Sequence, residues 1–251
     1  MSYGMYISAE GAQIQAKRLE FIANNLANVD TPGFKRDVPT FQARFAEAIQ
    51  QGLDIPGSTS ENDIGGGVKL MEVNTDFSRS TVRSTGVSTD FAIGGDGFFT
   101  LQNEQGETVL SRAGNFMLDT QGRLVSQYGQ LPVLDDAGSE IALNPDQPFE
   151  IQAGGIIVQQ DDSVSIGLMK PQSLGDLVKV GSNTFRSLGP TSPVLQEERD
   201  VRQGYLEKSG VEPTREMMAM IETSRAFEAN TKLIQHQDSM VSSLINRVLT
   251  R

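Results

Sequence analysis

Apolar and small residues recur near the start of the chain at alternating spacings of four and three. The positions that follow this pattern are Met5, Ala9, Ala12, Ala16, Leu19, Ala23 and Leu26. Such a repeat places its members along one side of an α-helix, and it is typical of a helix that packs against another helix rather than on a sheet. The four alanines in this stripe would allow the partner helix to approach closely.

The end of the chain repeats this signal at intervals of seven residues. One stripe consists of Met220, Phe227, Ile234, Val241 and Val248, and a second, one position earlier, of Ala219, Ala226, Leu233 and Met240. Pro213 suits a first helical turn, and neither Gly nor Pro follows it. We expect the two terminal helices to pair and to leave apolar surface for other helices, although an ordinary four-helix bundle can show the same heptads.

The middle of the chain has the pattern of a β-structure. Short apolar segments such as 91–93, 98–101, 149–151, 155–158, 164–166 and 177–180 alternate with turns rich in Gly and Asp, at 94–97, 103–106, 119–122 and 135–138. This punctuation is typical of hairpins in an antiparallel sandwich or barrel. Residues 50–67, with three consecutive glycines at their end, have the composition of a flexible connector.

Charge divides the chain in the same way. The net charge of the 251 residues is −11, and all of it comes from residues 36–204, because both ends are neutral. We therefore predict a mainly β fold with α-helices, in which discontinuous terminal helices form a coiled-coil-like domain around an inserted all-β domain. The expected parts are a terminal-helix assembly domain of residues 1–35 plus 205–251, a connector of 36–80 and a central β-domain of 81–204.

Composition excludes several kinds of chemistry. The absence of Cys removes disulfides, thiolate metal sites and Cys nucleophiles, and His236 as the single His rules out a multi-His metal site. The acidic balance argues against binding to nucleic acid. No segment resembles a spanning helix, and the first ten residues have no basic region typical of a cleaved signal peptide. We expect no cofactor, no metal, no small-molecule substrate and no catalytic residue.

The remaining polar motifs have simpler interpretations. The run Gly94–Gly97 lacks the helix start and the Lys of a phosphate-binding loop, so we interpret it as a hairpin turn. The pairs Asp135-Asp136 and Asp161-Asp162 lack the spacing of a calcium loop and fit ordinary turns. His236 lies away from the apolar stripes and is expected in solvent or at an interface.

Residues 22–36 change the interpretation, because IANNLANVDTPGFKR resembles the N-terminal signature of flagellar rod and hook proteins. Its motif positions are Asn24, Asn25, Leu26, Ala27, Asn28, Thr31, Pro32, Gly33, Phe34 and Lys35. Three further segments are similar to motifs of that family in the same order: 91–99, 111–122 and 203–230. One departure is Gly210, which stands where the family usually has Asn.

This resemblance implies a structural subunit of the flagellar basal-body rod that polymerises through its terminal helices into a helical axial tube. The implied assembly interface is the set of apolar stripe positions named above. The implied partners are copies of the chain, other rod and hook axial proteins and the flagellar type III export apparatus, which would export the chain without a cleaved signal. The length suits the proximal F-type and distal G-type rod proteins, and residues 74–78 favour the F type.

Two other functions were weighed against this one. A rod-associated peptidoglycan hydrolase would need a carboxyl group in an apolar pocket, and the sequence offers no such setting. A hook or hook-cap relative would carry extra outer domains, which this length does not accommodate.

Overall fold

A computed structural model describes residues 3–43, 52 and 67–249, and these residues form two compact units. The first unit consists of 1–27, 37–76 and 212–251, and the second of 28–36 and 77–211. The fold is mostly β with a helix near each end of the chain, as the sequence predicted. The segment 28–36 belongs to the second unit.

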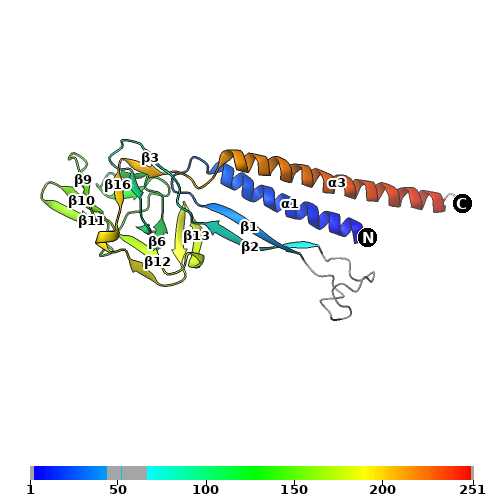
Figure 1. Cartoon of the computed structure of the whole chain (residues 1–251), viewed down its shortest axis with the longest axis horizontal. Helices are drawn as coiled ribbons and strands as arrows, with labels where there is room; N and C mark the ends of the chain where they lie inside the picture. Colours follow the sequence, from blue (N-terminus) through cyan, green and yellow to red (C-terminus); the bar gives the residue numbers. More distant parts are fainter. Residues whose placement is uncertain (1–2, 44–51, 53–66, 250–251) are drawn as a thin grey trace. The chain divides into compact units, whose positions relative to one another are not determined.

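The first unit is built on two helices, α1 (Tyr3–Ala27) and α3 (Pro213–Leu249). They lie side by side along α1 (Figure 1) and run antiparallel, since Gly4 faces Gln237 and Gly11 faces Asn230. Helix α3 begins at Pro213, as predicted, because a proline at this position loses no helical hydrogen bond. Its 37 residues make it about 55 Å long at 1.5 Å per residue.

Two strands complete the first unit, β1 (Arg36–Ala43) and β2 (Val68–Asp76), which pair with each other. They occupy the two ends of the expected connector. Thr75 donates a hydrogen bond from Oγ1 to Asp37 Oδ1 at 3.0 Å, and Thr40 donates from Oγ1 to the Glu72 carbonyl oxygen at 2.9 Å. Apart from Gly52 and Gly67, the expected flexible segment 50–67 lies outside the described residues.

The second unit contains five antiparallel sheets. The largest has the order β13-β14-β6-β5-β12-β15, and the others are β11-β10-β9, β16-β4, β17-β3 and β7-β8. The strands are β3 (Val82–Ser84), β4 (Phe91–Ile93), β5 (Phe98–Gln102), β6 (Thr108–Ser111), β7 (Phe116–Leu118), β8 (Leu124–Ser126), β9 (Glu150–Gln152), β10 (Ile156–Gln159), β11 (Asp162–Ser165), β12 (Leu168–Pro171), β13 (Leu177–Gly181), β14 (Thr184–Ser187), β15 (Thr191–Pro193), β16 (Val201–Gln203) and β17 (Tyr205–Glu207). Short 3₁₀ turns, η2 (Leu174–Asp176) and η3 (Gln196–Glu198), join some of them.

The second unit has an aromatic core. Phe116 contacts both Phe91 and Phe99 edge to face, with ring centroids 5.6 and 5.1 Å apart. A smaller cluster joins Phe77 to Phe98 and Phe185 at 5.9 and 5.2 Å. Each fully buried Phe contributes about 1.5–3 kcal/mol, so these clusters account for much of the stability of the unit.

Two predicted hairpins are confirmed and one predicted hairpin is wrong. The turns at 103–106 and 119–122 connect paired strands, β5 with β6 and β7 with β8. Residues 94–97 do not form a hairpin turn, because β4 pairs with β16 while β5 pairs with β6 and β12. Gly97, at φ +120°, instead carries the chain from one sheet to another.

Candidate assembly surface

Helices α1 and α3 meet through small and polar residues. A Cβ atom on Gly4 would lie 2.9 Å from Gln237 Nε2, and one on Gly11 would lie 3.1 Å from Asn230 Nδ2. The residues of the two helices that are buried are Ser8, Ile22, Asn25, Glu216 and Thr223. Of these only Ile22 is a large apolar residue. Close approach at glycines, rather than extensive apolar burial, therefore defines this contact.

The alanine-rich stripe of α1 is not the face that lies closest to α3. The face with Gly4 and Gly11 is one position earlier in each heptad. Ala9 and Ala23 are exposed, and the other predicted positions, Met5, Ala12, Ala16, Leu19 and Leu26, are of intermediate exposure. The stripe thus remains accessible over much of its length in the single chain.

On α3, the predicted positions divide along the helix. Met220, Phe227 and Ile234 are of intermediate exposure, on the same side of the helix as Thr223 and Asn230. Val241 continues this stripe by seven residues and is exposed. The side chain of Val248 lies outside the described residues. The stripe is therefore covered where α1 lies against it and open beyond Gln237.

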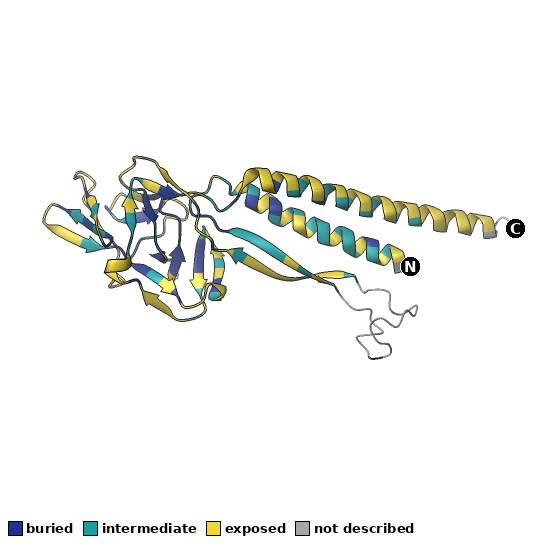
Figure 2. Cartoon of the chain, in the orientation of Figure 1, coloured by how far each residue is buried: buried dark blue, intermediate teal, exposed yellow. Residues whose placement is uncertain are grey.

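Most of helix α3 is exposed (Figure 2), and large apolar side chains are among its exposed residues. They are Met217, Met218, Ile221, Leu233, Met240, Val241, Leu244 and Ile245, and they are between 41% and 63% exposed. Five of them were missed by the sequence stripes: Met217, Met218, Ile221, Leu244 and Ile245. A search for apolar residues outside the seven-residue repeat could have found them, because a helix that contacts several partners needs more than one apolar stripe.

The signature segment, residues 24–36, contributes to both units. Asn25 is buried in α1 and exchanges two hydrogen bonds with Asp37, from Asn25 Nδ2 to the Asp37 carbonyl oxygen at 2.9 Å and from the Asp37 N–H to Asn25 Oδ1 at 3.0 Å. Helix α1 ends at Ala27, and the Thr31 N–H donates to the Asn28 carbonyl oxygen at 3.2 Å in the turn that follows. Asn24 and Leu26 belong to the last helical turn, where Asn24 is exposed and Leu26 is of intermediate exposure.

The second half of the signature is anchored in the second unit. Asn183 donates from Nδ2 to the Pro32 carbonyl oxygen at 2.8 Å, and Gly33 adopts φ +65°. Phe34 is buried, with the Lys179 ammonium 4.4 Å from its ring centroid. These contacts make residues 32–35 part of the β unit rather than a free joint.

Among the charged residues of the signature, Lys35 is the most deeply buried. Its side chain is only 1% exposed and donates from Nζ to Glu207 Oε1 at 2.7 Å and to the Ser78 carbonyl oxygen at 2.8 Å. Arg112 Nη1 lies 3.5 Å from the other oxygen of Glu207. Burial lowers the pKa of the Arg112 guanidinium, and the Glu207 charge opposes that effect. The sequence identified Lys35 through its motif but gave no sign of Glu207 as its partner.

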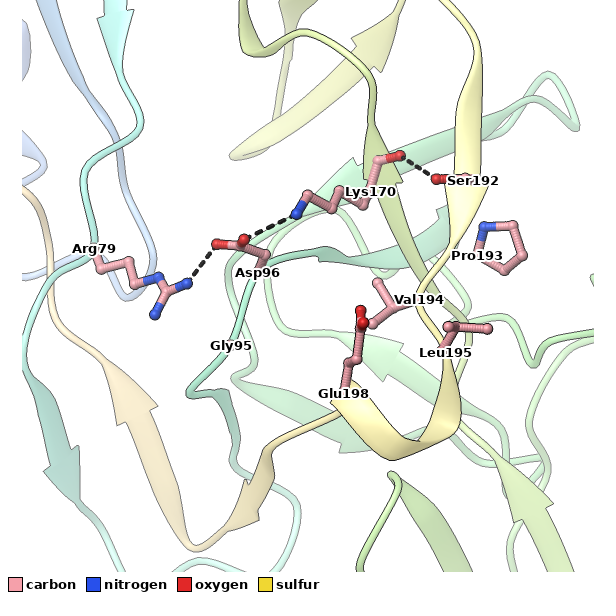
Figure 3. Close-up of a pocket in the computed structure, with 9 residues that line it drawn as sticks. All are labelled: Arg79, Gly95, Asp96, Lys170, Ser192, Pro193, Val194, Leu195 and Glu198. Atoms are coloured by element: carbon pink, nitrogen blue, oxygen red, sulfur yellow. Dashed lines mark hydrogen bonds and ion pairs between the residues drawn. The ribbon is translucent and has the colours of Figure 1, made fainter.

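An open cleft of 440 Å³ lies elsewhere in the second unit (Figure 3). Asp96 stands at its edge between Arg79, which donates from Nη2 to Oδ1, and Lys170, whose Nζ lies 2.9 Å from Oδ2. The hydrogen bond from Arg79, followed by that from Lys170, lowers the pKa of Asp96 to about 2. An acid held ionised by two cations has no proton to donate near neutral pH, so the cleft lacks a general acid at this position.

The other acidic motifs have structural partners. Asp135 Oδ1 accepts hydrogen bonds from the Ala137 and Ser139 N–H groups, as expected of a turn, and Asp136 binds the Arg199 guanidinium through both oxygens at 2.8 and 2.9 Å. His236 is exposed on α3, as predicted. Within the described part of the chain, no three acidic, His or Cys side chains are grouped to hold a metal ion.

Among the described helices, none combines the length and the apolar character needed to cross a bilayer.

Comparisons with known proteins agree along the whole chain. Three family models match: "Flagella basal body rod protein" over residues 5–35, "Flagellar hook protein FlgE/F/G D1 domain" over 92–166, and "Flagellar basal body rod FlgEFG protein C-terminal" over 202–247. A flagellar basal-body rod protein FlgF of Caulobacter vibrioides is 32% identical over 99% of this chain and 98% of its own length. A flagellar basal-body rod protein FlgG of Bacillus subtilis is 34% identical over 98% of this chain and 99% of its own length.

Proposed function

Because the chain belongs to the flagellar basal-body rod protein family, we propose that it polymerises through its terminal helices into the axial tube of the flagellum. It is a structural protein of the flagellar basal body and not an enzyme. Its partners in the rod are other rod and hook proteins, and copies of itself. In this proposal residues 1–35 and 205–251, which include both helices, form the assembly domain, 36–80 the connector and 81–204 a β-domain outside the tube wall.

The observation that supports polymerisation is the uncovered apolar surface of α3. Met240, Val241, Leu244 and Ile245 are all exposed, and they follow Gln237, the last residue of α3 with a described contact to an α1 glycine. A contiguous apolar surface on a helix that already has one partner marks a site for another protein. A helix of a neighbouring subunit would bury these side chains, each for about 1.5–3 kcal/mol.

We assign the chain to the F type rather than the G type. The support is the sequence of residues 74–78, NTDFS, which resembles the F type. Relatives of both types match at nearly equal identity, so the position of the chain along the rod is the test of this assignment.

Export is the remaining part of the proposal. We infer that the flagellar type III apparatus exports the chain unfolded and without a cleaved signal peptide. The support is the membership of the rod family, whose model matches residues 5–35.

The test is a charge on the exposed part of α3. We expect Leu244→Asp to block rod assembly, because an unpaired carboxylate buried in a helix contact costs several kcal/mol. Ser242→Asp, two residues away and also exposed, adds the same charge outside the apolar group and serves as the matched control. The measurements are swimming motility and the number of rods in basal bodies, in strains that carry each variant as their only copy.

The expected result is loss of motility and of rods with Leu244→Asp and normal motility with Ser242→Asp. Circular dichroism of both purified variants should show the same β content, since the substitution lies outside the second unit. Normal rods with Leu244→Asp would contradict the proposed assembly surface.

A further inference from the structure

One buried ammonium group joins three distant parts of the second unit. Lys35 Nζ donates to the carbonyl oxygen of Ser78, 43 residues later, and to Glu207 Oε1, 172 residues later. Glu207 Oε1 also accepts a hydrogen bond from the Ser80 N–H at 3.1 Å. Lys35 and Glu207 are 1% and 3% exposed, so water does not compete for these bonds.

Backbone hydrogen bonds join the same segments. The Gly33 N–H donates to the Glu207 carbonyl oxygen at 2.9 Å, and the Gly210 N–H donates to the Phe34 carbonyl oxygen at 2.8 Å. We call residues 33–35 and 207–210, with the ion pair between Lys35 and Glu207, the motif clasp. One half of the clasp follows α1 along the chain, and the other half precedes α3.

We propose that Lys35 and Glu207 are positioning residues, which promote the pairing of α1 with α3 by holding together the segment that follows α1 and the segment that precedes α3. Phe34 lies seven residues after Ala27, and Gly210 lies three residues before Pro213. With the clasp closed, about ten residues therefore separate the end of α1 from the start of α3. This inference concerns the single subunit, and it holds independently of the proposed polymerisation.

Loop-closure entropy gives the size of the effect. If the clasp opens while the rest of the second unit stays folded, α1 remains connected to it through the paired strands β1 and β2, where Thr75 bonds to Asp37, and then through residue 77. The connection between the helix ends then runs through 27–37, 75–77 and 207–213, and it grows from about ten to roughly 18 residues. Because the cost of closing a loop scales as (3/2)RT ln n, the closed clasp favours helix pairing by about two- to threefold.

The contact between the helices makes this contribution important. Gly4 and Gly11 face Gln237 and Asn230, and Ile22 is the one large apolar side chain that is fully buried among the described residues of α1. Because the other apolar side chains are only partly covered, such a contact gains less from the hydrophobic effect than a fully buried core. Isolated helices are also marginal in water, so the pairing depends on how close the two helix ends are held.

The charges of the clasp predict an order of effects among variants. Lys35 and Arg112 are two buried cations beside one buried anion, Glu207. Lys35→Met removes one cation and leaves Glu207 paired with Arg112. Glu207→Gln leaves two cations without their anion, which is the less stable arrangement in a low-dielectric interior. Glu207→Gln should therefore open the clasp more than Lys35→Met.

Hydrogen exchange of the full chain tests the proposal. Amide protection in α1 reports helix pairing, and protection in β5 and β6 reports the folding of the second unit. We expect protection in α1 to fall about two- to threefold more than in β5 and β6 with Glu207→Gln, and by a smaller factor in the same direction with Lys35→Met. Lys17→Met is the matched control, because it removes an exposed ion pair with Glu20 (3.2 Å) from α1 itself.

The control should leave the ratio of protection between α1 and β5–β6 unchanged. Equal losses in α1 and in β5–β6 with both clasp variants would show a purely structural ion pair and overturn the proposal. Unchanged protection of α1 with Glu207→Gln would overturn it as well. If Glu207→Gln does not fold, the test rests on Lys35→Met, which keeps the Glu207–Arg112 pair. The ratio of amide protection between α1 and β5–β6 in that variant then decides for or against the proposal.

Discussion

Gly33 shows how one residue of the signature depends on a distant segment. Its φ of +65° lies in the left-handed region, and a Cβ atom there would stand 2.4 Å from the carbonyl carbon and oxygen of Arg112. The sequence could predict that Pro32 and Gly33 end a helix. It could not predict that the backbone of residue 112 occupies the space next to Gly33, because nothing local encodes that approach.

Gly86 provides a matched comparison for a prediction at Gly33. Gly86 has φ +71° and no heavy atom within 4 Å of its Cβ position. Gly86→Ala should lower the free energy of unfolding of the second unit by about 1–2 kcal/mol, the cost of a left-handed residue alone. Gly33→Ala should cost clearly more, about 3 kcal/mol or above, since the added methyl also displaces backbone. Urea unfolding followed by circular dichroism measures both, and equal losses would refute the contact argument.

At the scale of elements, periodicity predicted the helices well and their contact faces poorly. The seven-residue repeat of Met220, Phe227 and Ile234 lies on the side of α3 that faces α1. On α1, however, the alanine stripe was expected in the seam, whereas Gly4 and Gly11 lie there. Apolar patterns cannot reveal a contact that is made by glycine and amide side chains, because these residues add nothing to hydrophobic periodicity.

The β elements show the same limit. Segments and turns at 103–106 and 119–122 were predicted correctly, because each turn joins neighbouring strands. The turn at 94–97 was misassigned, because its flanking strands pair with β16 and with β6 and β12, which come from distant parts of the chain. Strand order depends on long-range contacts that a local pattern does not contain.

The close contact at Gly11 gives a prediction for the helix pair. Gly11→Leu should weaken pairing, although leucine favours helix formation, because its side chain must displace Asn230 from the seam. The expected loss is about 1–3 kcal/mol in the stability of the first unit, measured by the thermal unfolding of the helical signal. Gln13→Leu, at an exposed position of the same helix, is the control and should not lower that stability. A Gly11→Leu protein as stable as the control would contradict this seam.

At the scale of the whole molecule, the two units follow different rules. The first presents apolar side chains of α3 on its surface, while the second buries a large cluster around Phe91, Phe99 and Leu101. A well-packed β unit and helices with uncovered apolar surface suit the proposed subunit, whose apolar surface neighbouring subunits would cover. This division is the physical basis of the proposed role in the rod.

Cryo-electron microscopy of basal bodies from the bacterium that carries this chain tests the central claim most directly. The account predicts that subunits of this chain occupy the rod and that Met240, Leu244 and Ile245 of each α3 are buried against helices of neighbouring subunits. It also predicts that the β units make a smaller share of the contacts between subunits. A rod in which this end of α3 faces solvent, with the wall formed by contacts between β units, would contradict the account.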